Sequence, residues 1–169
     1  DTFRAYLMFM GPFDEGGDWN DQGITGIDRF LKKVWRFCQL PNSEENPSKK
    51  DLQVLHQTIQ SVSHDLEQMK FNTAISRLME FINYFSTHES VERDFKLNMI
   101  KMIAPLTPHI AEELWEINEG EASVFLESFP EYEKSLTEED TMTIAVQING
   151  KLRGSVEVSK QIEKDALLA

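Results

Sequence analysis

The sequence predicts a mainly α-helical fold, an antiparallel helical bundle followed by a β-hairpin and the start of one more helix. Apolar residues recur at helical spacing through most of residues 1–116. Between those stretches lie prolines, glycines and small polar residues of the kind that cap or end helices. From Thr141 onward the apolar residues alternate with a period of two, which is typical of strands.

The composition fits a globular domain in which charge is unevenly distributed. Hydrophobic residues make up 40% of the 169 positions, enough for a core. The net charge of −12 argues against a generic nucleic-acid binder, yet residues 104–140 hold 11 acids and a single base, Lys134. The remainder, with 18 acids and 16 bases, is close to neutral. A local basic surface is therefore compatible with the acidic total.

Several kinds of protein are disfavoured by simple counts. Cys38 is the only cysteine, which excludes an intramolecular disulfide and a cysteine-based metal site. No apolar run approaches the ~18 residues of a membrane span, and no signal peptide is recognisable. The chain opens on Asp1 within an apolar helical pattern, so we expect it to be a piece of a longer protein.

A helical stripe predicts a short first helix over residues 1–10. Its apolar positions are Phe3, Tyr6, Leu7 and Met10. Pro12 follows the end of this helix, and a polar loop continues to Gly23. Trp19 in that loop has two interpretations, stacking on a nucleic-acid base or packing against the nearest core, and the second is the commoner.

The helix predicted over Ile24–Leu40 is central to the fold because it carries different residues on two faces. Its apolar positions, at about 100° per residue, are Ile27, Phe30, Leu31, Val34, Trp35 and Cys38. Its basic positions lie on the opposite side and are Arg29, Lys32, Lys33 and Arg36. One face predicts a core contact. The other is either a solvated basic face or a surface that binds phosphate groups.

Three more helices are expected before residue 104. The first, over residues 48–69, begins with a capping box of Ser48 and Asp51. Its apolar seam is Leu52, Leu55, Ile59, Val62, Leu66 and Met69. Asn72 and Ser90 are placed to cap the next two helices. The inward positions of these two are Ile75, Leu78, Met79, Ile82, Phe85, Phe95, Met99, Met102 and Ile103.

Residues 104–116 predict a tight joint between two helices, followed by an acidic connector. Thr107 is expected to cap the second helix, with Pro108 at its first position. His109 and Glu113 suggest metal-ligand spacing, but zinc needs three or four ligands and no partner motif is present. We therefore expect no metal site and reject a metallohydrolase. The connector over residues 119–140 has three candidate anchors, Phe125, Phe129 and Tyr132.

The alternating segment Thr141–Val158 predicts a β-hairpin that turns at Asn149-Gly150. Ser159 is placed to cap a last helix, which the chain leaves incomplete.

Two hairpin registers are possible. A two-residue loop would place Val146 opposite Arg153 and mix apolar with charged residues on one face. A three-residue loop places Val146 opposite Leu152 and Met142 opposite Val156, and burial of one face favours this second register.

Four stretches occur along the chain in the order DTFRAYLMFMGP, GIDRFLKKVWRF, APLTPHIAEELWE and VQINGKLRGSVEV. In this order they resemble the C-terminal part of bacterial-type leucyl-tRNA synthetases, across essentially the whole chain. The first three also resemble class I synthetases for valine and isoleucine, so the hairpin stretch is the discriminating one. The chain departs from the pattern at Phe129-Pro130, where a tryptophan–proline pair is common, and it ends about halfway through the family's C-terminal domain.

The resemblance implies three parts. Residues 1–20 would follow the catalytic domain, residues 21–140 would form the helical anticodon-binding domain, and residues 141–169 would begin a truncated α+β domain that contacts the tRNA elbow. Leucine enzymes largely do not read the anticodon, so the bundle is expected to contact the tRNA body. The implied tRNA-binding residues are Arg29, Lys32, Lys33 and Arg36 of the helix, with Lys151 and Arg153 of the hairpin's outer face.

The implied function is to position tRNA(Leu) for ATP-dependent attachment of leucine by the catalytic domain of the same synthetase. This chain has no HIGH-type or KMSKS stretch, so we expect it to hold no catalytic residue or cofactor and to be inactive alone. The full-length enzyme would use ATP with magnesium. The expected partners are tRNA(Leu) and the remaining synthetase domains, in the cytoplasm and away from membranes.

Two alternatives remain open. One is the equivalent domain of a valyl- or isoleucyl-tRNA synthetase. The other, from a different functional class, is a helical protein-interaction module whose acidic connector binds a basic partner.

Overall fold

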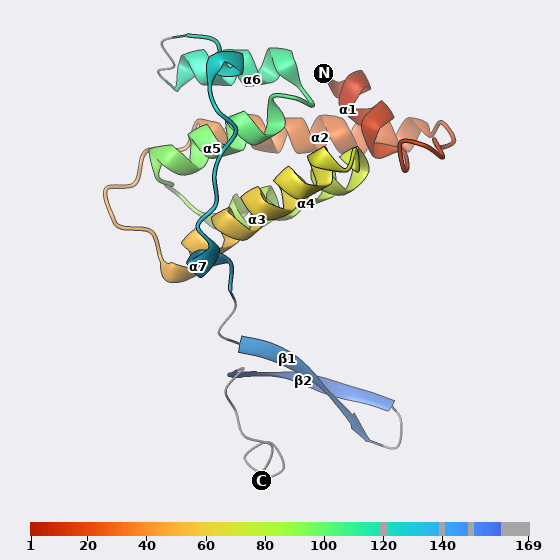
Figure 1. The fold of residues 1–169 in the computed structure, drawn as a ribbon, viewed down its shortest axis with the longest axis vertical. Helices are drawn as coiled ribbons and strands as arrows, with labels where there is room; N and C mark the ends of the chain where they lie inside the picture. Colours follow the sequence, from red (N-terminus) through yellow and green to blue (C-terminus); the bar gives the residue numbers. More distant parts are fainter. Residues whose placement is uncertain (119–121, 139–140, 149–150, 160–169) are drawn as a thin grey trace. The chain divides into compact units, whose positions relative to one another are not determined.

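The computed structural model describes residues 1–118, 122–138, 141–148 and 151–159, the last two ranges by their backbone. The chain is mainly helical (Figure 1) and divides into two compact units, residues 1–137 and 138–169. The helices are α1 Thr2–Phe9, α2 Asp21–Cys38, α3 Lys49–Glu67, α4 Phe71–Tyr84, α5 Arg93–Ile103, α6 Pro108–Ile117 and α7 Lys134–Thr137. Short 3₁₀ segments are η1 Phe85–Thr87 and η2 Val124–Leu126, and the strands are β1 Thr141–Ile148 and β2 Lys151–Ser159.

Helix α2 begins earlier than its apolar pattern predicts, because Asn20 caps it. The Asn20 side chain accepts a hydrogen bond of 2.8 Å from the N–H of Gln22, and the backbone N–H of Asn20 donates to the Tyr6 hydroxyl at 2.7 Å. Gly23 packs so closely on Tyr6 that a Cβ would lie 2.6 Å from the ring. Trp19, half exposed, packs edge-on against Tyr6 at 4.9 Å. The loop therefore joins α1 to the start of α2.

The predicted capping box at the start of α3 is confirmed. The Ser48 hydroxyl accepts from the Asp51 N–H at 3.1 Å, and the Asp51 carboxylate accepts from the Ser48 N–H at 3.2 Å. Tyr84 at the end of α4 donates to the same carboxylate at 2.9 Å. Although burial opposes ionisation, the hydrogen bonds from Ser48 and Tyr84 lower the pKa of Asp51. Burial, together with the Asp51 carboxylate, raises the pKa of Tyr84 to about 12.

Two other predicted caps are wrong. Helix α4 begins at Phe71, one residue before Asn72, and it has no side-chain cap. Helix α5 begins after Glu92, while Ser90 precedes a short parallel bridge between Val91 and Asn42. That bridge extends the backbone beyond Ser90, so the helix starts later than the local sequence suggests.

Helix α6 is capped from the far end of the unit. Thr107 occupies the cap position, but its buried hydroxyl donates to the carbonyl of Ile103 at 3.4 Å instead of capping. The Asp1 carboxylate accepts a hydrogen bond of 2.6 Å from the Ile110 N–H, and its other oxygen lies 3.0 Å from Nδ1 of His109. A negative charge at a helix N-terminus is favourable, so Asp1 takes the role predicted for Thr107.

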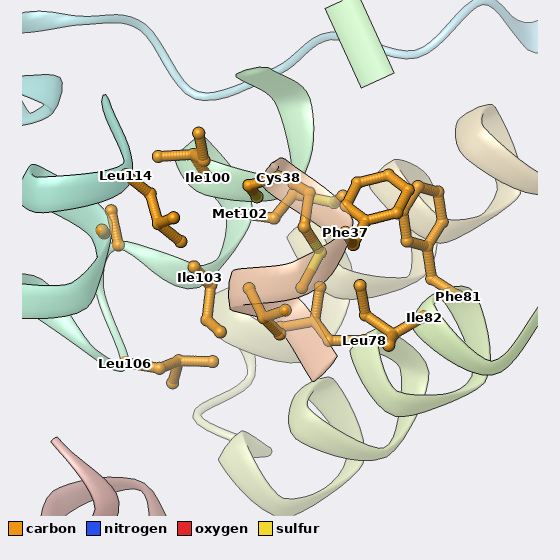
Figure 2. Close-up of a cluster of buried hydrophobic side chains, with 14 of the residues drawn as sticks. Phe37, Cys38, Leu78, Phe81, Ile82, Ile100, Met102, Ile103, Leu106 and Leu114 are labelled. Atoms are coloured by element: carbon orange, nitrogen blue, oxygen red, sulfur yellow. The ribbon is translucent and has the colours of Figure 1, made fainter. Parts of the chain in front are cut away.

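The core is built around the apolar face of α2. Figure 2 shows Phe37 beside Phe81, and their ring centres are 5.6 Å apart. Both are buried, and neither was among the predicted inward positions. Met69 was predicted to face inward. It instead follows the end of α3 with a φ of 54° and is exposed. Of the three predicted connector anchors, Phe129 packs against the core, whereas Phe125 and Tyr132 are exposed, and the buried residue is instead Val124.

The strands β1 and β2 pair antiparallel, with a register that differs from the predicted one. Val146 lies opposite Gly154, rather than Leu152 or Arg153. The pairs on either side are Ile148 with Lys151, Gln147 with Leu152, Ile144 with Val156 and Met142 with Val158. A bulge at Arg153 shifts the register, so Ile144 and Met142 lie opposite apolar residues, while Gln147 and Ile148 next to the turn lie opposite Leu152 and Lys151. The predicted turn at Asn149-Gly150 and the last helix lie outside the described residues.

Candidate nucleic-acid interface

The four cations predicted on α2 are all exposed and form a basic ridge, which we define as Arg29, Lys32, Lys33 and Arg36. At about 100° per residue, their positions span an arc of roughly 100° around the helix. The stripe on the other side is buried at Ile27, Phe30, Leu31, Val34 and Cys38, and partly buried at Trp35. The two-faced pattern read from the sequence is thus the pattern of the folded helix.

The ridge keeps most of its charge available to a ligand. Lys32 pairs with Asp28 on the same helix at 2.8 Å, a contact that is weak because both side chains are exposed. Lys33 donates to the neutral Asn83 side chain at 2.7 Å, and Arg36 Nε donates to the carbonyl of Lys32 at 3.4 Å. For Arg29, no hydrogen bond or ion pair is found within the described ranges.

Two hollows lie next to the ridge. One, of about 260 Å³, is lined by Arg29, Lys33, Met79 and Asn83 among others. The other, of about 250 Å³, is lined by Lys33 and Arg36 together with residues of α4, η1 and His88. Lys33 borders both. The surface beside the ridge is therefore concave on both sides of the Lys33–Asn83 contact.

The end of α2 is fixed by a buried lysine of α5. Lys96 is 3% exposed, and its amine donates to the carbonyl of Leu40 and, at 2.8 Å, to the Asn42 side chain. Burial lowers the pKa of Lys96 and raises that of the nearby Cys38 thiol to about 12. The thiol is therefore neutral, and the lysine serves the helix end rather than the exposed ridge.

The acidic connector uses several of its groups internally. Glu112 accepts hydrogen bonds from the Ser123 hydroxyl and from the Val124 N–H, and Glu127 pairs with Lys101 at 2.8 Å. Glu112 of α6 and Glu127 of the connector thus hold the connector to α5 and α6.

Helix α3 holds the end of the connector through a histidine. The N–H of Glu133 donates to Nδ1 of His56 at 3.1 Å, and Gln57 donates to the carbonyl of Thr137 at 3.0 Å. Burial lowers the pKa of His56, although the Glu133 carboxylate opposes this. The imidazole accepts this hydrogen bond only when Nδ1 carries no proton.

We expect the α3–connector contact to weaken as the pH falls from 7.5 to 5. The pKa of His56 is lower in the folded state than the 6.5 of a free imidazole. Its contribution to stability is therefore full above 6.5 and is lost as the pH falls through the folded pKa. The measurement is the protection of the Glu133 amide against hydrogen exchange. His56→Asn supplies an acceptor that does not titrate, so a pH profile in this variant that matches the native one would contradict the assignment.

The side chains of Lys151 and Arg153, the other two predicted site residues, lie outside the described part of the chain. Their backbone belongs to β2, with Lys151 opposite Ile148 and Arg153 at the bulge. Across the described residues, no group of three His, Cys, Asp or Glu is arranged to hold a metal ion, and none of the helices has the length and hydropathy to cross a membrane.

Comparison with protein families adds independent information. A family model described as the anticodon-binding domain of tRNA ligase matches residues 49–168, well over half of the chain. This chain belongs to the anticodon-binding domain family of tRNA ligases. The matched residues include α3 to α7 and both strands, and the ridge lies on the helix that precedes them.

Curated relatives of this anticodon-binding domain include leucine–tRNA ligases. That of Chloroherpeton thalassium is 41% identical over the whole chain, and that of Dehalococcoides mccartyi is 38% identical over 98% of it. The chain spans 22% of the length of each. It is thus similar to about a fifth of a longer protein.

A solved structure shares the fold. The LeuRS of Agrobacterium radiobacter, crystallised in a ternary complex with tRNA and LeuAMS, aligns with 99% of this anticodon-binding domain at a TM-score of 0.73 and 24% identity. The chain covers 24% of that protein.

Sequence reasoning missed two residues beside the ridge of this anticodon-binding domain, Asn83 and His88, and also Lys96, which holds the end of α2. Lys96 had a detectable signal, because it falls at helical spacing with the apolar Met99 and Ile100. Asn83 and His88 had none, because they reach the ridge only when α4 and η1 pack against α2.

Proposed function

We propose that this chain is the tRNA-binding helical module of a leucine–tRNA ligase, and that the basic ridge of α2 contacts phosphate groups of tRNA(Leu). The observation that carries the proposal is the exposure of four cations on one face of a helix whose other face is buried in the core. Phosphate contacts position an RNA without reading its sequence. Family membership and the similarity to leucine–tRNA ligases support this reading.

The remaining activity belongs, in this proposal, to parts of the longer relatives that the chain does not match. Leucine activation with ATP and magnesium, and transfer of leucine to tRNA(Leu), would take place there, in the cytoplasm. Residues 141–169 would begin a C-terminal domain that also contacts tRNA, with Lys151 and Arg153 on its basic face. The family match through residue 168 supports treating this segment as part of the same module.

Reversing two ridge charges tests the proposal. We expect Arg29→Glu combined with Arg36→Glu to weaken tRNA(Leu) binding about tenfold or more near 0.1 M salt. The slope of log affinity against log salt should flatten by about 2, one for each lost phosphate contact. The measurement is filter binding across a salt series, with tRNA(Leu) and an unrelated tRNA. Both RNAs should be affected alike, because phosphates carry no sequence information.

The matched control is Lys50→Glu combined with Arg77→Glu, which changes the net charge equally at exposed positions of α3 and α4. The proposal requires this control to bind tRNA as the native chain does. An equal loss in both double variants would mean that net charge alone is responsible, and an unchanged salt slope in the ridge variant would remove the ridge from the interface.

A further inference from the structure

The larger part of one hollow beside the ridge is apolar, although its rim is basic. The hollow of about 250 Å³ lies between the second half of α2 and the η1 segment. Phe37, Ile82 and Phe85 border it from the core and are almost completely buried, whereas Leu40 and the His88 ring, about a third exposed, line its accessible side. Lys33 and Arg36 stand at its rim. A ligand that matches both regions must combine a flat apolar group with an adjacent negative charge.

The walls of this hollow are held in place by contacts within the protein. On one side, the Lys33 amine donates a hydrogen bond of 2.7 Å to the Asn83 side chain. On the other side, the His88 ring packs on Phe85 with ring centres 4.8 Å apart, and its Nε2 lies 3.5 Å from the Asp51 carboxylate. A preformed site loses little conformational entropy when a ligand binds.

The size of the hollow restricts the ligand further. It lies below the roughly 300–1,000 Å³ typical of sites for drug-sized molecules. One ring system therefore fits, whereas an extended chain does not. Proteins that bind single-stranded nucleic acid combine positive charge along the backbone with aromatic residues that receive bases. The ridge supplies the positive charge, and the hollow beside the second half of α2 supplies an aromatic lining.

We propose that this hollow receives one unstacked nucleotide of the bound RNA, with the base against Leu40 and the His88 ring and its phosphate at Lys33 and Arg36. This proposal rests on the proposed function and adds to it a base contact. The ridge alone holds a phosphate backbone of any conformation. The hollow selects an RNA region in which one base is free to leave its stack.

Titration with small probes tests the hollow without RNA. In the isotope-labelled 169-residue chain, AMP at millimolar concentration should shift the NMR signals of Leu40, Ile82 and Phe85. Inorganic phosphate and ribose 5-phosphate should shift signals of Lys33 and Arg36 while leaving the Ile82 methyl groups unchanged. AMP shifts that match those of inorganic phosphate, or that map away from the hollow, would overturn the proposal.

Filling the hollow tests it with tRNA. Ser86 lines the hollow and Thr87 does not, yet both are exposed and adjacent in η1. Ser86→Tyr should weaken tRNA(Leu) binding roughly fivefold or more, because the tyrosine ring would occupy the space of the base and the stacking contribution of that base to affinity would be lost. Thr87→Tyr should bind as the native chain does. Neither substitution removes a ridge charge, so the salt slope should stay unchanged in both.

The combined outcomes separate the two proposals. Ridge reversal that weakens binding, with Ser86→Tyr equal to Thr87→Tyr, would overturn the nucleotide site and leave the proposed function standing. If ridge reversal has no effect on tRNA binding, the proposed function fails and the nucleotide site fails with it.

Discussion

Replacing Phe85 with alanine is expected to lower the free energy of unfolding by about 3–5 kcal/mol, the range measured when large aromatic residues are removed from cores. Phe85 is 1% exposed at the start of η1. Its ring lies 4.8 Å from that of Phe81, 5.8 Å from Phe37 and 5.5 Å from Phe95, between centres. It therefore joins α2, α4 and α5, and its loss leaves a cavity where the three meet.

Urea unfolding followed by tryptophan fluorescence measures this effect in the helical unit, because all three tryptophans lie within residues 1–137. Phe125→Ala is the control, since Phe125 is exposed and its removal should change stability by no more than about 0.5 kcal/mol. Phe85→Leu should fall between the two, because it retains part of the buried volume. A loss below about 1 kcal/mol for Phe85→Ala would mean that the three helices do not depend on this ring.

The features predicted well are those that a short window of sequence determines. The two faces of α2 follow from helical periodicity, which places Arg36 and Val34 on opposite sides whatever surrounds the helix. The capping box of Ser48 and Asp51 is similarly local, since its partners are three residues apart. In both cases the tertiary structure adds to the local preference and does not compete with it.

The features predicted poorly depend on residues far apart in the chain. Thr107 has the right chemistry for a cap, but the Asp1 carboxylate reaches Ile110 from the opposite end of the unit. A charged acceptor makes the stronger hydrogen bond, so the hydroxyl turns elsewhere. In the strands, the predicted three-residue-loop register is wrong, because Val146 lies opposite Gly154 and a bulge at Arg153 shifts the pairing away from the turn. Several backbone solutions satisfy one apolar pattern.

The nucleotide hollow could not be predicted at all from the sequence. Phe85 reads as an ordinary core position and His88 as a residue of a loop. Only the packing of η1 beside the second half of α2 places an apolar floor next to Lys33 and Arg36. The ridge is a property of one helix, whereas the hollow is a property of three segments.

Replacing Lys96 with alanine is expected to lower the free energy of unfolding by about 3 kcal/mol. The substitution leaves the Leu40 carbonyl and the Asn42 side chain without their donor, which costs about 1–3 kcal/mol, and it also removes a buried alkyl chain. Lys96→Met keeps the chain and removes only the amine, so it should lose about 1–2 kcal/mol. Lys50→Met, at an exposed position, is the control.

Alkaline pH provides the decisive measurement for Lys96. Because burial lowers its pKa, the folded chain releases this proton at a lower pH than the unfolded chain, whose lysine pKa is about 10.4. As the pH rises through that window, the free energy of unfolding of the native chain should therefore increase relative to that of Lys96→Met. Tyr84, with its pKa raised to about 12, makes stability fall above pH 10, but it does so in both proteins and cancels in the difference. A constant difference between native and Lys96→Met from pH 7 to 10.5 would contradict the lowered pKa of Lys96.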